Sequence, residues 1–277
     1  MDTKNEGQIK RSLKTRHLSM IALGGSIGTG LFIASGSAIT TAGPGGALLA
    51  YCVMGIMVYF LMTSLAEMAT YIPLTGSFAA YASKFVSPAT GFALGWNYWF
   101  NCAITVPVEI TTVGIVMNFW FPHVPSWVFS GVVFLLIFII NYLSVKSYGE
   151  TEFWLSLIKV VAVCAFLVVG VLVIFGIMGG KAPVGMRNFT YGKAPFVNGI
   201  QGIVSVFLVA GFSFQGTEMI GIAAGESANP EKSVPKAIKS TFWRILLFYI
   251  CTILVIALIL PYTNKNLLSS DVQDIVT

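Results

Sequence analysis

The stretches GGSIGTG (residues 24–30) and GFSFQGTE (residues 211–218) each interrupt a long apolar segment of this 277-residue chain near its middle. Glycines and polar residues at such places predict that a membrane-spanning helix is broken there. A break at membrane depth exposes backbone N–H and C=O groups that lipid cannot satisfy, so it is tolerated where it lines a cavity. The two interruptions therefore predict an all-α integral membrane protein with an interior binding cavity, which is typical of a transporter.

The composition agrees with a membrane protein. Apolar residues make up 56% of the chain, charged residues 10%, and the mean hydropathy is +0.83, far from the balance of soluble globular proteins. We expect seven spans, because seven apolar stretches approach or exceed the roughly 20 residues that cross a bilayer. They cover residues 18–40, 46–71, 90–119, 126–143, 153–178, 198–224 and 240–261. The first is too long and too glycine-rich for a signal peptide.

Basic residues predict the orientation of these spans. With the amino terminus inside, the inner segments carry ten basic residues and the outer segments four, which favours a cytoplasmic amino terminus in a multi-pass protein of the inner or plasma membrane. The net charge of +5 is thus mostly a topology signal, and no basic patch with interleaved aromatic residues indicates nucleic acid as a partner. The expected inner connectors are residues 72–89, 144–152 and 224–239, and the outer ones are 41–45, 120–125 and 179–197.

Metal, cofactor and enzyme chemistry are not indicated. The cysteines lie singly in apolar spans without CxxC spacing or a nearby histidine, so we expect no metal site. No nucleophile–base pair is recognisable, which argues against an enzyme. The glycine spacing of residues 24–30 is similar to a dinucleotide-binding loop, but no strand precedes it and no βαβ unit surrounds it, so no cofactor is expected.

Three ionisable residues lie inside predicted spans. They are Glu109 in the third span, Lys159 in the fifth and Glu218 just beyond the second interruption. Each costs several kcal/mol in lipid unless it faces protein or water, so each is a candidate functional residue. The alternative for each is a neutralised or paired structural residue.

The two interruptions suit opposite charges. A helix restarting after the first break presents N–H groups of Gly28, Thr29 and Gly30, with the hydroxyl of Ser26 nearby, to an anion such as a carboxylate. The alternative is that these glycines only allow two helices to pack closely. Unwound carbonyl groups at the second break suit an ammonium group. Together the breaks fit an α-amino acid, and their separation by five spans is what an inverted repeat produces.

Three strings carry a resemblance to a known family: RSLKTRHLSMIALGGSIGTGLF (11–32), EFWLSLIKV (152–160) and FSFQGTEMIGIAAGESANPEKSVPKAI (212–238). The chain resembles the amino acid permeases of the amino acid-polyamine-organocation superfamily, and is most similar to bacterial lysine-specific permeases. The resemblance runs from about residue 10 to about residue 262. It implies a LeuT-like inverted-repeat fold with about twelve spans, of which spans 1 and 6 are discontinuous.

The resemblance also implies roles for residues of the two breaks. The carboxylate site of the family corresponds to Ser26, Gly28, Thr29 and Gly30. Phe212 takes the position of an aromatic gate, and Gln215 lies where a backbone carbonyl receives the substrate amine. Glu218 matches the acidic residue just beyond the break, and Phe214 is a further candidate for the amine or gate region.

Three more roles follow from the resemblance. Lys159 resembles the lysine that, in proton-coupled members, takes the place of a sodium ion, and alternating water access would let it exchange a proton. A lysine substrate needs an acceptor for its own ammonium, for which Glu109 and Glu218 are the available intramembrane carboxylates, and Glu109 is the candidate for side-chain specificity. Glu226 is a candidate for an inner gate, with a solvated loop acid as the alternative.

The expected organisation is a cytoplasmic tail (1–17), a permease domain (18–262) and an extracytoplasmic polar tail (263–277). Since the family has about twelve spans, we expect a truncated chain with a complete first repeat and a second repeat only begun. The expected function is import of an amino acid, with lysine the expected substrate, by proton symport in the lipid bilayer. The alternatives are an exchanger of the same fold and a non-transporting receptor or remnant.

Overall fold

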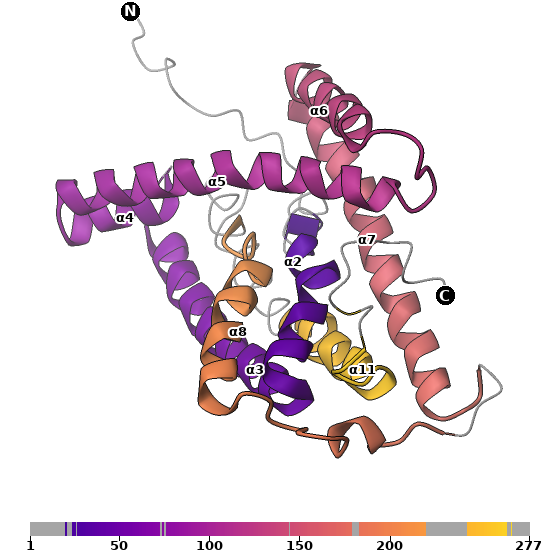
Figure 1. Ribbon diagram of the computed structural model, residues 1–277. Coiled ribbons are helices and arrows are strands. Elements are labelled where there is room, and N and C mark those ends of the chain that lie inside the picture. The colour runs from indigo at the N-terminus through magenta and orange to yellow at the C-terminus, as the bar shows by residue number, and fades with distance from the viewer. Residues whose placement is uncertain are drawn as a thin grey trace, which may run out of the picture.

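The computed structural model describes residues 20, 24–25, 27–72, 74, 76–143, 145–178, 183–219, 243–264 and 267 (Figure 1). Every regular element in these ranges is a helix and none is a strand, so the all-α prediction is confirmed. The elements are α2 (Thr29–Phe32), α3 (Ala34–Tyr71), α4 (Ser77–Phe85), α5 (Pro88–Met117), α6 (Ser126–Leu143), α7 (Val145–Ile174), the 3-10 helix η1 (Arg187–Phe189), α8 (Gly199–Ser213), the π-helix η2 (Ile245–Ile250) and α11 (Cys251–Ile259).

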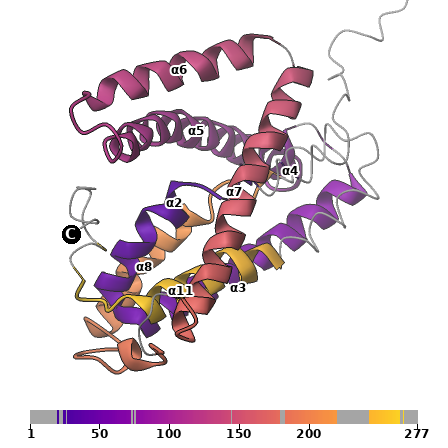
Figure 2. The same ribbon diagram turned by 90° about the vertical axis from the view of Figure 1, so that its right-hand side faces the viewer.

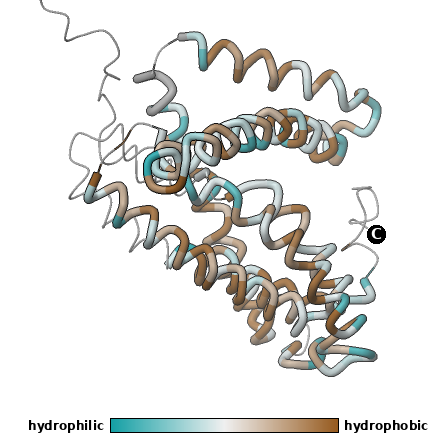
Figure 3. Tube along the Cα trace, turned by 90° about the vertical axis from the view of Figure 1, so that its left-hand side faces the viewer, coloured by the Kyte–Doolittle hydropathy of each residue, from teal (hydrophilic) through white to brown (hydrophobic). Residues whose placement is uncertain are grey.

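Among the described residues, three helices are long and apolar enough to cross a membrane. They span Ala34–Tyr71, Pro88–Met117 and Glu150–Ile174, and shorter apolar helices cover Ser126–Tyr142, Gly199–Ser213 and Ile245–Ile259. Figure 3 shows hydrophobic residues along most of the long helices and hydrophilic residues mainly near helix ends and connections. Such a distribution suits helices whose sides meet lipid and whose ends meet water.

The helices form two layers (Figure 2). α5 and α6 contact each other in one layer, with α4 against α5, while α2, α3, α8 and α11 form the other. The long helix α7 runs across both and contacts α6 and α11. The buried core lies mainly in the second layer, where Tyr51, Val206 and Tyr249 are fully enclosed. This arrangement leaves the space between the layers to be lined by α5 and α7 on one side and by α2 and the end of α8 on the other.

The helix α3 consists of two helical segments that meet at Gly43. This residue has φ 78° and ψ 170°, and Pro44 follows it, so the helical hydrogen bonding is interrupted where an outer connector was expected. The segment before α8 supplies replacement partners: Pro195 O accepts from Gly45 N at 2.9 Å, and Ala42 O accepts from Val197 N at 2.9 Å. Two connectors predicted for the same membrane side therefore lie against each other.

Candidate functional site

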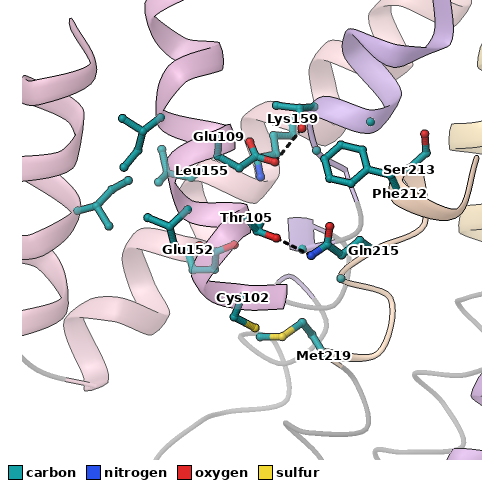
Figure 4. Close-up of a pocket in the computed structure, with 18 of the residues that line it drawn as sticks. Cys102, Thr105, Glu109, Glu152, Leu155, Lys159, Phe212, Ser213, Gln215 and Met219 are labelled. Atoms are coloured by element: carbon teal, nitrogen blue, oxygen red, sulfur yellow. Dashed lines mark hydrogen bonds between the residues drawn. The ribbon is translucent and has the colours of Figure 1, made fainter. Parts of the chain in front are cut away.

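A cavity of about 690 Å³ lies between the two layers. Its wall includes residues of both interrupted stretches together with the facing sides of α5 and α7 (Figure 4). Segments far apart in the sequence, from residue 25 to residue 219, thus converge on one space. A volume of several hundred Å³ is typical of a site for a small organic molecule.

The first interruption is a local unwinding before α2. Ile27 and Gly28 are not helical, Gly28 is extended with φ −130° and ψ −166°, and helical structure resumes at Thr29. Gly28 O accepts from Leu31 N at 3.1 Å and from Phe32 N at 3.3 Å. The first N–H groups of a helix have no intrahelical partner and carry partial positive charge. The restart of the helix therefore directs a positive backbone end at the cavity.

Glu109 of α5 lies against this helix start. Its Oε1 accepts a hydrogen bond from Thr29 Oγ1 at 2.9 Å, and a Cβ added at Gly28 would lie 3.4 Å from the same oxygen. The added Cβ would thus be at ordinary contact distance from the carboxylate, which shows how closely Glu109 approaches the backbone of the break. The contact joins α5 to the first break.

Lys159 of α7 lies on the other side of the first break. Its Nζ donates to Gly24 O at 3.2 Å, just before the chain unwinds. Ser156, one turn earlier and fully buried, occupies the space that a side chain at Gly24 would need. The break is thus held between α5 and α7, each of which supplies an ionisable side chain.

The second interruption follows the end of α8 at Ser213. Residues 214–218 form turns in which Gly216 has φ 92°, a left-handed conformation that favours glycine. The side chain of Glu218 folds back, and its Oε2 accepts from Gly216 N at 2.9 Å. The Nε2 of Gln215 donates to Thr105 Oγ1 of α5 at 2.7 Å. α5 therefore contacts both breaks.

The two phenylalanines of the second break face different surroundings. Phe212 lines the cavity and is 38% exposed, whereas Phe214 is 2% exposed and its ring lies 4.3 Å from that of Tyr249. The turn after Ser213 directs the ring of Phe214 into the core, where Tyr51 is a second aromatic neighbour at 6.0 Å. Of the two gate candidates, only Phe212 is positioned to cover a ligand in the cavity.

The cavity brings together most of the residues that the sequence singled out. Those lining it are Gly28, Thr29, Gly30, Glu109, Lys159, Phe212, Gln215 and Glu218. Ser26 and Glu226 lie outside the described residues. Within the described ranges, no group of three or more His, Cys, Asp or Glu side chains is arranged for a metal ion.

Several lining residues were not foreseen from the sequence: Tyr98, Cys102, Thr105, Glu152 and Met219. Helical spacing contained the signal, because residues 98, 102, 105 and 109 follow the repeat of one α5 face, and residues 152 and 159 share a face of α7. Starting from Glu109 and Lys159 and stepping back by three, four or seven residues would have found three of the five.

Known proteins with similar sequences share one activity class. Residues 17–276 match the amino acid permease family. The histidine permease of Lactococcus lactis is 60% identical over 267 residues, and the lysine-specific permeases of Escherichia coli and Lactococcus lactis are 56% and 58% identical over 267 and 276 residues. These alignments cover 96–98% of the chain and 54–56% of the relatives, so the chain spans about half the length of the curated relatives it matches.

Proposed function

The chain belongs to the amino acid permease family, and we propose that the complete protein imports an amino acid into the cell by proton symport with alternating access. Its relatives are permeases and not enzymes, and in this proposal the protein is likewise a transporter. The observation that carries the proposal is the cavity at which two interrupted helical stretches meet. Backbone groups freed by such breaks are the usual means by which transporters bind charged substrates at membrane depth.

The proposed binding mode uses one break for each charge of the amino acid backbone. The substrate carboxylate binds at Gly28, Thr29 and Gly30, with Ser26 as a further donor, because a helix start favours an anion. The substrate amine binds at the turn after α8, where carbonyl groups leave the helical pattern and Glu218 adds negative charge. Phe212 covers the bound molecule, and Glu226 contributes to an inner gate.

Lysine is the proposed substrate. Two of the relatives are named as lysine-specific permeases and a third as a histidine permease, so all three names refer to amino acids with basic side chains. A side-chain ammonium inside a membrane protein needs a carboxylate partner. The sequence offers Glu109 and Glu218 as candidates for this partner, and both line the cavity together with Glu152.

Lys159 is the proposed proton-coupling residue. It lines the cavity and donates to Gly24 O at the start of the first break, so its proton is linked to the backbone that rearranges there. A partly buried ammonium close to a helix break changes its water access when the break opens to one side or the other. That change supplies the alternation that coupling requires.

The proposed architecture is LeuT-like, with seven spans of an expected twelve in this chain and spans 1 and 6 discontinuous. The proposed location is the inner or plasma membrane with a cytoplasmic amino terminus. The paired connectors around Gly43 and Pro195 support an arrangement in which residues 41–45 and 179–197 share one membrane side.

Uptake of labelled lysine into vesicles containing the full-length protein tests the proposal. We expect accumulation to require an inward proton gradient and to be lost in Lys159→Ala. Lys193→Ala is the matched control, because Lys193 is exposed and lies outside the cavity, and this variant is expected to behave as the wild type. Full gradient-driven accumulation by Lys159→Ala would exclude the proton-coupling role.

Two alternatives give different results in the same vesicles. An exchanger is stimulated by substrate loaded on the opposite side and moves no protons. A receptor or remnant binds the amino acid without taking it up. Transport that follows the imposed gradient excludes both.

A further inference from the structure

We propose that Glu152 of α7 is the specificity-determining residue of the cavity, and that its carboxylate receives the positively charged side chain of the substrate. This inference rests on the proposed function and deepens it, since it identifies which of the three carboxylates lining the cavity is available to a ligand. The other two are Glu109 and Glu218.

The hydrogen bonds of the three carboxylates separate them. Glu109 accepts from Thr29 Oγ1 at 2.9 Å, and Glu218 accepts from Gly216 N at 2.9 Å. Each is therefore held by a group of the neighbouring break. Among the described residues, Glu152 accepts one hydrogen bond, from Ser156 on its own helix, and this bond is long at 3.3 Å. Because this bond is long and its donor lies on the same helix, Glu152 is held less firmly than the other two carboxylates and is free to turn towards a ligand.

The position of Glu152 suits a side chain more than an amino acid backbone. Figure 4 shows Glu109, Thr105 and Glu152 on one side of the cavity and residues of the second break on the other. A substrate whose carboxylate and amine are held by the two breaks extends its side chain towards the wall formed by α5 and α7. Glu152 is the acidic residue that α7 contributes to that wall.

The rest of the α7 face favours this direction. Leu155 and Lys159 line the cavity along the same face, three and seven residues after Glu152. Leu155 offers an apolar surface for the methylene stem of a long side chain. Lys159 repels an ammonium group from its own end of the wall, about 10 Å further along the helix. The charge pattern of α7 therefore directs a cationic side chain to Glu152.

Comparison of lysine with norleucine distinguishes recognition of the side-chain ammonium from a general role of Glu152 in binding. In the full-length protein, we expect Glu152→Gln to raise the Kd and the KM for lysine by roughly tenfold or more, because a buried cation loses its charged partner. Norleucine has a side chain of similar length without the ammonium group, and its competition for the site should be unchanged or stronger. Glu152→Asp keeps the charge and should retain most of the preference for lysine.

The controls assign each outcome. Glu67→Gln alters an exposed carboxylate of α3 outside the cavity and should change neither ligand. Equal loss of lysine and norleucine binding in Glu152→Gln, or a selective loss of lysine in Glu109→Gln alone, would overturn the inference. If Glu152→Gln does not fold, as judged by size-exclusion chromatography, Glu152→Ala decides, and an unaltered ratio of lysine to norleucine affinity in that variant overturns the assignment. A wild type that binds neither ligand refutes the proposed function, whereas lysine uptake unaffected by Glu152→Gln refutes this inference alone.

Discussion

Gly30 is a residue at which the first break lies directly against the end of α8, where the second break begins. A Cβ added at Gly30 would lie 2.5 Å from Ser213 Cα and 2.9 Å from Ser213 N, so it would meet backbone and not a flexible side chain. Ser213 itself is fixed, because its Oγ pairs with the buried hydroxyl of Tyr51 at 2.8 Å and donates to Val209 O at 3.0 Å. An added Cβ at Gly30 therefore cannot be accommodated without moving the backbone at one of the two positions.

We therefore expect Gly30→Ala to separate the breaks and to abolish lysine uptake. The cost of overpacking at such a site is typically about 1–3 kcal/mol, so the midpoint of thermal unfolding in detergent should also fall. Gly131→Ala in α6 is the matched control, because a Cβ at Gly131 meets no atom within 4 Å. Normal uptake by Gly30→Ala would mean that the close approach of the breaks is not needed for transport.

The residues of the two breaks could be identified from the sequence, but the directions of their side chains could not. The glycines and the intramembrane charges of Glu109, Lys159 and Glu218 are conspicuous in apolar surroundings, so they could be selected one by one. The sequence does not distinguish Phe212 from Phe214, because both are phenylalanines next to the same break. The turn after Ser213 sends one ring to the cavity and the other to Tyr249, and this turn depends on tertiary packing.

At the level of elements, α5 connects the two breaks. On one face of α5, Glu109 accepts a hydrogen bond from Thr29, and Thr105 accepts one from Gln215. On the same face, the hydroxyl of Tyr98 lies 3.5 Å from Met219 Sδ. A helix that bonds to both breaks restricts their movement relative to each other. In alternating access, these are contacts that one or the other break must exchange.

Thr105→Val tests this connection while preserving side-chain shape. The variant removes the acceptor of Gln215 Nε2, and the loss of one hydrogen bond costs about 1 kcal/mol, or roughly fivefold in lysine affinity. Thr111→Val is the control on the same helix, since both hydroxyls donate to the carbonyl four residues earlier but Thr111 does not line the cavity. Equal lysine affinities of the two variants, measured by equilibrium binding, would show that the bond to Gln215 does not support the site.

The span expected to begin at residue 90 begins at Pro88 in the structure. Ser87 and Pro88 form a clear start signal, and in the structure Ser87 Oγ accepts from Thr90 N at 3.1 Å as the cap of α5. In contrast, α4 lies within residues 72–89, which were expected to be a connector. Hydropathy finds segments long enough to cross a bilayer, and nine residues are too few. A tertiary contact, Tyr81 OH to Ile72 O at 2.8 Å, helps to hold this short helix.

At the level of the whole molecule, large apolar side chains remain exposed along α5, α6 and α7, among them Trp99, Phe138 and Ile158. In water such a surface would be costly, and lipid is the natural surrounding for it. Hydropathy and charge therefore predicted the class of protein well. They could not predict the two-layer packing or the cavity, because these depend on contacts between segments more than 100 residues apart, such as Thr105 with Gln215.

The orientation of the chain gives a prediction for the whole molecule. The excess of basic residues assigns the region of α4 to the cytoplasm and the connector between α5 and α6 to the outside. Lys84, at the end of α4, and His123, in that connector, are both exposed, so each tolerates a cysteine.

In full-length protein with all native cysteines replaced, a membrane-impermeant maleimide should label His123→Cys in intact cells and Lys84→Cys only after permeabilisation. The matched pair flanks a single long helix, α5, so opposite accessibility means that α5 crosses the bilayer once. Labelling of both positions from the same side would contradict the crossing, and a reversed pattern would contradict the cytoplasmic amino terminus while leaving the crossing intact.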